Sequence, residues 1–273
     1  MDKEIYQKII AKKELSQLPK KDVERVFAKF DNGKYGDEEK VKLARKLLRE
    51  MFSAFVSQKL LKLKDKDAEW VLKKHVSTRE RFEYYGEIYK RILNTGAGAH
   101  PSPLTILDLG AGVNGFSYKF LSATSAHPSE SHPNEARLAR PKYLAVEAVG
   151  QLVDLMNAYF EKEKLNARAI HASLFELEKI KKLIKSQRGK KVVFLFKTLD
   201  SLEMVQRDYS KKLLKEIMPL VEKVVVSFAV RSIGKRERFR ANRKWLIDFI
   251  KENFEIKDDF ELGGERYVVF SKR

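Results

Sequence analysis

The stretch from Leu104 to Asn114 constrains the fold of this chain more than any other part of the sequence. Leu104 to Leu109 form an aliphatic and β-branched run, which predicts a buried parallel strand. Gly110-Ala111-Gly112 follow at once, and a helical pattern begins after them. A strand, a tight glycine turn and a helix start are typical of open α/β sheets that bind nucleotide-type ligands at their carboxyl edge, where Asp108 stands. By itself the Gly-x-Gly spacing also fits an ordinary strand-to-helix turn, so other parts of the chain must decide.

The composition limits the class of protein. With 273 residues, 43% of them hydrophobic, the chain is long enough for one large α/β domain and a smaller one. The absence of cysteine excludes disulfides, thiolate metal sites and a cysteine nucleophile. No apolar run reaches the roughly 18 residues of a membrane span, and the first residues lack the apolar core of a signal peptide, so we expect a cytoplasmic protein. A net charge of +18 favours a polyanionic partner, although a lysine-rich, thermally adapted surface explains part of it.

Residues 1–75 are predicted to form a separate helical domain. From Val41 to Val56, apolar residues recur at steps of three and four, which indicates one face of a helix that begins at Asp37. Asp22 is a candidate N-cap for an earlier short helix. Twenty Lys or Arg residues stand against thirteen Asp or Glu residues in this segment. A basic domain that docks on RNA and a solvated helical cap over the second domain both fit this pattern.

Strands and helices alternate through the rest of the chain, 76–273, which we interpret as one domain. The strands are expected at 104–109, 142–147, 167–171, 191–197 and 224–228, and the helices at 79–93, 113–122, 149–164, 174–187, 208–220 and 240–252. A terminal hairpin is expected at 254–261 and 266–271, joined through Gly263-Gly264. This is the layout of Rossmann-like, class I S-adenosylmethionine (SAM) methyltransferases. The sequence therefore predicts an α/β fold, a mostly parallel sheet with a C-terminal antiparallel hairpin, and SAM as the cofactor.

Two positions after the second and third strands bear on this cofactor. Glu147 ends the second strand, where a carboxylate can accept two hydrogen bonds from a ribose diol. Ser173 follows the third strand, where such enzymes often place an aspartate against the adenine amine. A serine serves this purpose only weakly. His127 and His132 have neither cysteine nor a helical i, i+4 spacing beside them, so we expect no metal.

The segment after the fourth strand limits the methyl acceptor. Lys197-Thr198-Leu199 stand where methyltransferases meet their substrate, without the Asn/Asp-Pro-Pro-Tyr/Phe motif that holds an exocyclic amine. Without cysteine, covalent addition to a pyrimidine is excluded as well. A ring nitrogen such as guanine N7 needs neither device, because its lone pair is already nucleophilic and carries no proton. We therefore predict no catalytic side chain, only positioning.

A strongly basic segment follows the fifth strand. Residues 231–244 hold seven basic residues and one acidic residue, at the ligand side of the sheet. Clustered positive charge at a helix start opposes the helix dipole, so helix stability does not account for it. Contact with the phosphates of an RNA backbone accounts for this cluster of positive charge. The predicted RNA-binding residues are Arg231, Ser232, Lys235, Arg236, Arg238 and Arg240.

Four stretches together resemble a known family. They are His75 to Arg81, Ile106 to Asn114, Phe194 to Glu203 and Val226 to Gly234. In this order they resemble the aminoglycoside-resistance 16S rRNA methyltransferases of the ArmA/Rmt type, which methylate guanine N7 in the decoding site of the 30S subunit. The resemblance implies this activity, 16S rRNA within the 30S subunit as the partner, and a monomer.

The resemblance also implies roles for individual residues. Arg79 resembles the arginine that pairs with the SAM carboxylate. The full set of expected cofactor-binding residues is His75, Ser77, Thr78, Arg79, Asp108, Gly110, Ala111, Gly112, Asn114, Glu147, Ala148, Ser173, Leu174, Lys197, Thr198 and Leu199. The chain departs from the family at Ala111 (usually Cys), Gly115 (Pro), Glu147 (Asp), Ser173 (near a usual Asp) and Asp200 (Pro), and the 123–141 loop looks inserted.

Two other functions stay open from the sequence. The enzyme could methylate a different RNA, such as tRNA, or another rRNA position. A non-catalytic ribosome-assembly or RNA-binding factor that retains a SAM fold is the second alternative, and the weak adenine-side Ser173 favours it. A membrane-surface role fits less well, because the basic residues do not share one amphipathic helix.

Overall fold

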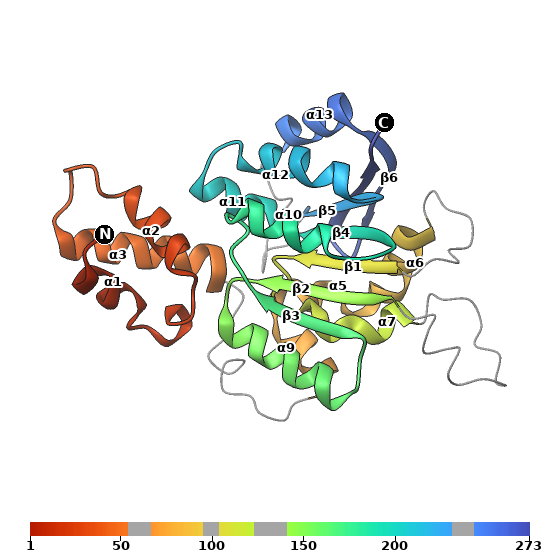
Figure 1. Cartoon of the computed structure of the whole chain (residues 1–273), viewed down its shortest axis with the longest axis horizontal. Coiled ribbons are helices and arrows are strands. Elements are labelled where there is room, and N and C mark those ends of the chain that lie inside the picture. Colours follow the sequence, from red (N-terminus) through yellow and green to blue (C-terminus); the bar gives the residue numbers. More distant parts are fainter. Residues whose placement is uncertain (54–66, 95–103, 123–140, 231–242) are drawn as a thin grey trace.

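The computed structural model describes residues 1–53, 67–94, 104–122, 141–230 and 243–273, and its centre is a seven-stranded sheet (Figure 1). The strands are β1 (Leu104–Leu109), β2 (Lys142–Glu147), β3 (Ala167–His171), β4 (Lys190–Phe196), β5 (Lys223–Ala229), β6 (Glu255–Leu262) and β7 (Glu265–Ser271). Their order is β3-β2-β1-β4-β5-β7-β6. The first five strands are parallel, and β7 is antiparallel to both of its neighbours. The predicted fold class is confirmed, and the first three strands have the predicted bounds.

The C-terminal hairpin turns where the sequence predicted. Gly263 and Gly264 both have positive φ, 61° and 76°, which fits a two-residue type I′ turn. This turn sets the register in which Leu262 faces Glu265. The hairpin thereby brings Glu265 to the first position of β7, beside β5, where its burial matters for the site described below.

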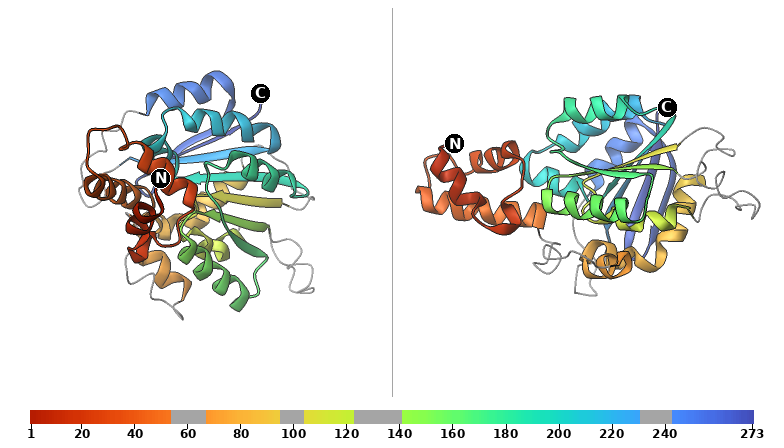
Figure 2. Two further views of the ribbon diagram at one scale, coloured as in Figure 1. Left: turned by 60° about the vertical axis from the view of Figure 1, so that its left-hand side comes forward. Right: turned by 60° about the horizontal axis from the view of Figure 1, so that its bottom comes forward.

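Helices cover both faces of the sheet (Figures 1 and 2). One face packs against α6 (Tyr85–Asn94), α7 (Tyr118–Ser122) and α9 (Gly150–Lys162), and the other against α10 (Leu177–Lys185), α11 (Leu199–Val205), α12 (Tyr209–Ile217) and α13 (Lys244–Asn253). Strand side chains alternate between the two cores, as in β5, where Val225 joins the first and Val224 and Val226 join the second. Burial of such apolar surface is the main stabilising contribution to a fold of this kind.

Two predicted helices are divided differently in the structure, and a third helix was not predicted. Residues 79–93 do not form one helix, because α5 (Val76–Arg81), a 3₁₀ turn and α6 follow each other there. The helix expected at 113–122 begins with a 3₁₀ turn, Asn114–Ser117. Helix α11 was not predicted at all, because Lys197 to Glu203 was interpreted only as a pocket wall. Local pattern cannot separate a short helix from a loop when both present apolar residues to a core.

The N-terminal segment is helical, as predicted. It contains α1 (Lys3–Ile10), α2 (Lys20–Ala28) and α3 (Asp37–Leu48), then a wider turn, Arg49–Ser53, while α4 (Ala68–Lys74) leads into α5. The expected continuation to Val56 lies outside the described residues. Asp22 is not an N-cap, because Pro19 occupies that position and Asp22 falls in the first turn of α2.

The N-terminal helices lie against the carboxyl edge of the sheet (Figures 1 and 2). The amide of Gly150, at the start of α9, donates to the carbonyl of Gln17 over 3.3 Å. Lys29 Nζ donates to the carbonyl of Met204 at the end of α11 over 2.7 Å. These contacts cover the ends of strands at which open α/β sheets bind ligands. Among the described helices, none is long and apolar enough to cross a membrane.

Candidate ligand-binding site

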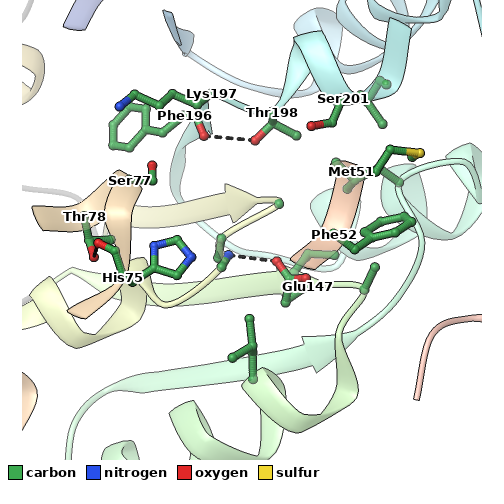
Figure 3. A pocket seen from close by; sticks show the side chains of 18 of the residues that line it. Met51, Phe52, His75, Ser77, Thr78, Glu147, Phe196, Lys197, Thr198 and Ser201 are labelled. Atoms are coloured by element: carbon green, nitrogen blue, oxygen red, sulfur yellow. Dashed lines mark hydrogen bonds between the residues drawn. The ribbon is translucent and has the colours of Figure 1, made fainter. Parts of the chain in front are cut away.

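A cavity opens at the carboxyl edge of the sheet, with about 880 Å³ of empty space that includes its mouth to the solvent. The turns after β1, β2, β3 and β4 form its wall, together with α5 and parts of the N-terminal segment. Figure 3 shows Lys197, Thr198 and Ser201 along one side, Glu147 and His75 along the other.

The glycine turn after β1 is fixed by close packing. Gly110 has φ +75°, and a Cβ there would lie 2.6 Å from Thr198 Cγ2. Thr198 Oγ1 donates to the carbonyl of Leu109 over 3.1 Å, which holds the β4 turn against the β1 turn. Gly112 has φ +55° and meets only His75, at 3.5 Å, so its conformation rather than space demands glycine. At Gly110 and Gly112 the turn after β1 therefore presents bare backbone to the cavity.

Gly115 extends the motif beyond the Gly-x-Gly spacing used in the sequence analysis. Together with Gly110 and Gly112 it completes Gly-x-Gly-x-x-Gly. A Cβ at Gly115 would lie 2.6 Å from Phe160 Cζ and 2.9 Å from Met156 Sδ, both on α9. The third glycine therefore permits close helix packing, its usual role in such motifs.

Glu147 connects two of the turns. Its Oε2 accepts from the amide of Gly112 over 2.8 Å and its Oε1 from the amide of Val149 over 2.9 Å. Burial raises the pKa of the Glu147 carboxyl, against the lowering effect of these backbone hydrogen bonds. Each carboxylate oxygen has a second lone pair, so the group can still accept two hydrogen bonds from a diol.

Arg79 and Arg81 differ sharply in placement. Arg79 is exposed and lies outside the cavity wall, whereas Arg81 is buried within it. The Arg81 guanidinium donates to Glu265 over 3.0 Å, to Asn114 over 2.9 Å and to Ser77 over 2.7 Å. Burial by itself would lower the pKa of Arg81, but Glu265 outweighs it and holds the pKa above its ordinary value.

Lys197 belongs to the same charged cluster. Its backbone has φ +55°, unusual for a residue with a side chain, and directs the ammonium group to Glu80 at 2.5 Å and Glu265 at 3.2 Å. Ser227 donates to the same Glu265. Two cations and two carboxylates thus balance each other at one end of the cavity, which reduces the cost of burying them.

His75 is held neutral beside this cluster. Burial lowers its pKa to about 3, with further lowering by the nearby charges of Arg81 and Lys197. Thr78 Oγ1 donates to the carbonyl of Leu72 over 2.7 Å and so anchors the turn between α4 and α5. This part of the wall offers polar atoms without adding charge.

Asp108 and Asn114 lie behind the cavity instead of lining it. Asn114 Nδ2 donates to Asp108 over 2.7 Å, and the Tyr143 hydroxyl donates to the same carboxylate. Tyr85 donates to Asn114 Oδ1 over 2.7 Å. Burial raises the pKa of the Asp108 carboxyl, while these two donors lower it. This network fixes the turn after β1 from behind.

The structure brings most of the expected cofactor-binding residues together. The cavity wall contains His75, Ser77, Thr78, Gly110, Ala111, Gly112, Glu147, Ala148, Leu174, Lys197 and Thr198. The wall does not include Arg79, Asp108, Asn114, Ser173 and Leu199. The RNA-binding positions Arg231, Ser232, Lys235, Arg236, Arg238 and Arg240, and the loop with His127 and His132, lie outside the described residues. No group of three His, Asp or Glu side chains in the described ranges could hold a metal ion.

Sequence reasoning missed several residues of the wall. Asp22, Met51 and Phe52 come from the N-terminal segment, and Arg81 and Ser201 come from helices next to expected positions. Arg81 could have been considered from the sequence, since it stands two residues after Arg79 in the same stretch, His75 to Arg81. The N-terminal residues carried no local signal, because only tertiary packing brings them to the sheet edge.

A glycine turn after β1, a carboxylate after β2 and a wall after β4, on a sheet of this strand order, define a Rossmann-like protein of the methyltransferase class. The model of the ribosomal RNA methyltransferase (FmrO) family matches residues 42–257, and the chain belongs to this family. A sequence comparison with curated proteins gives no match.

Solved structures share the fold over the whole chain. The 16S rRNA methyltransferase RmtF, in complex with S-adenosyl-L-homocysteine, is 19% identical with a TM-score of 0.76, and each chain is covered to 100%. The 16S rRNA methylase RmtB is 19% identical with a TM-score of 0.72, covering 99% of this chain and 98% of that one. An rRNA methylase from Escherichia coli is 19% identical with a TM-score of 0.71, covering 99% of both chains.

Proposed function

We propose that this protein is a cytoplasmic, monomeric SAM-dependent methyltransferase that modifies guanine N7 in the 16S rRNA decoding site of the 30S subunit, and so can confer aminoglycoside resistance. The observation that carries the proposal is the cavity between the glycine turn, Glu147 and the Lys197-Thr198 wall, in a chain of a ribosomal RNA methyltransferase family. RmtF, which shares this fold, binds S-adenosyl-L-homocysteine, the product form of SAM. The names of RmtF and RmtB support 16S rRNA as the substrate.

The cavity has a place for each part of the cofactor. Glu147 would accept the ribose hydroxyls, and the glycine turn would let the backbone approach the same sugar. Residues two apart on a helix leave opposite sides of it, so only Arg81 of the two arginines in α5 faces the cavity. We therefore place the SAM carboxylate beside Arg81 and Lys197, in place of the expected Arg79. Arg81 still has an N–H on each terminal nitrogen to donate.

The chemistry requires positioning more than proton transfer. Bound SAM would supply an electrophilic methyl group. Guanine N7 would accept that group through a lone pair that carries no proton, so no residue of this chain would have to remove one. Burial lowers the pKa of His75 to about 3, which makes its imidazole a weak base, and two carboxylates engage the Lys197 ammonium, so neither group is set up to take up a proton. Alignment of the flipped-out base with the methyl group would supply most of the rate.

Substrate RNA would be held by the basic segment after β5 and by the basic N-terminal helices. We expect the double change Lys235→Glu and Arg236→Glu to abolish methylation of 30S subunits and to leave SAM affinity unchanged, because phosphate contacts position the RNA and not the cofactor. Lys162→Glu, on the exposed end of α9, is the matched charge reversal and should keep activity. Full methylation by the double variant would place the RNA site elsewhere.

The decisive assay uses purified 30S subunits, labelled SAM and reverse-transcription mapping after borohydride and aniline cleavage. One new stop at a decoding-site guanine supports the substrate, the cofactor and N7 chemistry together. Methylation of free tRNA, or of another rRNA nucleotide, would replace the proposed target. SAM binding without incorporation into any RNA would support a non-catalytic assembly factor.

A further inference from the structure

Ser173, the residue expected near the adenine amine, does not face the cavity. Its hydroxyl donates to Asp22 Oδ1 and accepts from the amide of Phe175 over 3.0 Å. It is fully buried and absent from the cavity wall. No acid from the segment after the third strand is part of the cavity wall, and Ser173 is bonded to an acid from a distant part of the chain.

Asp22 itself is part of the cavity wall. It comes from α2 of the N-terminal segment, its residue is 1% exposed, and its Oδ1 accepts from Ser173. Its other oxygen, Oδ2, is buried and has no hydrogen-bond partner within the part of the chain that the structure describes. A buried carboxylate oxygen without a donor is costly, so its retention requires an explanation. A ligand that brings the donor supplies one.

The wall beside Asp22 suits a flat, apolar ring with one polar edge. Ala148, Leu152, Leu174 and Phe175 line the same end of the sheet, after β2 and β3. Glu147, the neighbouring acid, is already engaged by the Gly112 and Val149 amides and stands where the ribose is proposed to bind. Asp22 is thus the acid available to the base that this ribose carries.

We propose that Asp22, from the N-terminal helical segment, accepts a hydrogen bond from the exocyclic amine of the SAM adenine, in place of an acid after the third strand. The assignment rests on the proposed use of SAM and adds the residue that specifies an amino-purine. Ser173 then acts as a positioning residue, because its hydroxyl holds Oδ1 and leaves Oδ2 toward the ligand. The N-terminal segment, whose basic helices are proposed to meet RNA, would complete the cofactor site as well.

The test compares two ligands that differ at the purine amine: S-adenosylhomocysteine and its deaminated analogue, S-inosylhomocysteine. Inosine presents a carbonyl acceptor where adenine presents an amine donor. For the full-length protein at pH 7.5, calorimetry should show roughly tenfold or more preference for the adenosyl ligand, the usual size of a hydrogen bond to a charged group. With the Ser173 hydroxyl donating to the side-chain oxygen as in the wild type, Asp22→Asn turns its amide N–H to the ligand, so we expect the preference to vanish or reverse. Asp31→Asn, an exposed acid in the same segment, is the matched control and should keep it.

The calorimetry distinguishes failure of the Asp22 assignment from failure of the SAM proposal. If Asp22→Asn keeps the wild-type preference, the Asp22 assignment is overturned while SAM use stands. If the wild type binds neither ligand, the cofactor proposal and this inference both fail.

A measurement without any variant provides a second check. Burial raises the pKa of the Asp22 carboxyl to about 6, against lowering by Ser173 and Arg25 and with some raising by Glu176 and Glu147. Below that pH the carboxyl is neutral, and the wild-type preference should fall several-fold between pH 7.5 and pH 5. Titration of Glu147 affects the ribose that both ligands share, so it cancels in the ratio. A preference unchanged over this range would overturn the assignment.

Discussion

Asp22→Asn should stabilise the ligand-free protein, although it weakens the proposed adenine contact. Asp22 is a carboxylate in a buried place, with one oxygen unsatisfied, and burial raises its pKa from 3.8 to about 6. Above pH 6 the carboxyl is ionised in both the folded and the unfolded chain, so the folded state carries the desolvation cost. Below pH 3.8 it is neutral in both, and the cost disappears.

The size of the effect follows from the shift. About two pKa units correspond to about 3 kcal/mol of folding free energy at pH 7.5, and the linkage relation leaves about half of this at pH 5. Asparagine is neutral throughout, but its unpaired amide N–H costs about 1 kcal/mol. We expect a net gain of about 2 kcal/mol at pH 7.5, or roughly 4–8 °C in Tm for a chain of this length. At pH 5 the gain should fall below about 1 kcal/mol.

Calorimetric melting of the ligand-free wild type, Asp22→Asn and Asp31→Asn at both pH values measures this. The exposed Asp31 should show no comparable pH-dependent gain. An Asp22→Asn protein that melts at or below the wild type at pH 7.5, or gains equally at both pH values, would refute the argument that this carboxylate is retained at a cost to the fold. Added S-adenosylhomocysteine should then raise the Tm of the wild type more than that of the variant.

The remaining predictions concern the glycine turn, the arginines and salt. Gly110→Ala places a Cβ 2.6 Å from Thr198 at φ +75°, so the variant should lose about 2 kcal/mol or more of stability and most of its SAM affinity. Gly86→Ala adds a Cβ in open space on a helix, so thermal melts of this control should show neutral or raised stability. Arg81→Ala removes one of the two cations beside the buried Glu265, and only Lys197 stays paired with that carboxylate, so the variant should lose about 3 kcal/mol of stability. Arg79→Ala changes an exposed side chain and should keep SAM affinity; a calorimetric loss for Arg79→Ala alone would restore the role that the family resemblance gave it. Affinity for 30S subunits should fall steeply with added salt and SAM affinity should hardly change, because counterion release accompanies phosphate contacts only.

The strand framework could be predicted because its signal is local. The strands at 104–109 and 142–147 have apolar centres, the strand at 167–171 combines alanine and isoleucine with polar residues, and the bounds of all three match the structure. The hairpin turn could be predicted for the same reason, because two consecutive glycines favour the positive φ values that this turn requires. Helix α11 was not predicted, because a short amphipathic helix after a strand has the same composition as a loop that lines a pocket.

The site was harder to predict, because several of its contacts join distant segments. The sequence placed Ser173 near the adenine as a weak partner, but its bond to Asp22 spans 151 positions of sequence. Arg79 and Arg81 have equal claims as cations in a motif, and only the direction of α5 separates them. Periodicity assigns a face to a residue within its own helix, and does not say which other helix or strand that face will meet.

These contacts mean that the N-terminal helical part and the α/β part both contribute to the cavity wall. A boundary near residue 75 separates a helical part from an α/β part by pattern, yet Asp22, Met51 and Phe52 line the cavity together with residues after β1, β2 and β4. If the N-terminal helices hold RNA, any shift of α2 on docking would move the Asp22 carboxylate relative to the adenine pocket. By linkage, RNA binding and cofactor binding would then affect each other's affinity to the same extent. Asp22→Asn, which removes the proposed contact, should therefore reduce the effect of bound SAM on 30S affinity.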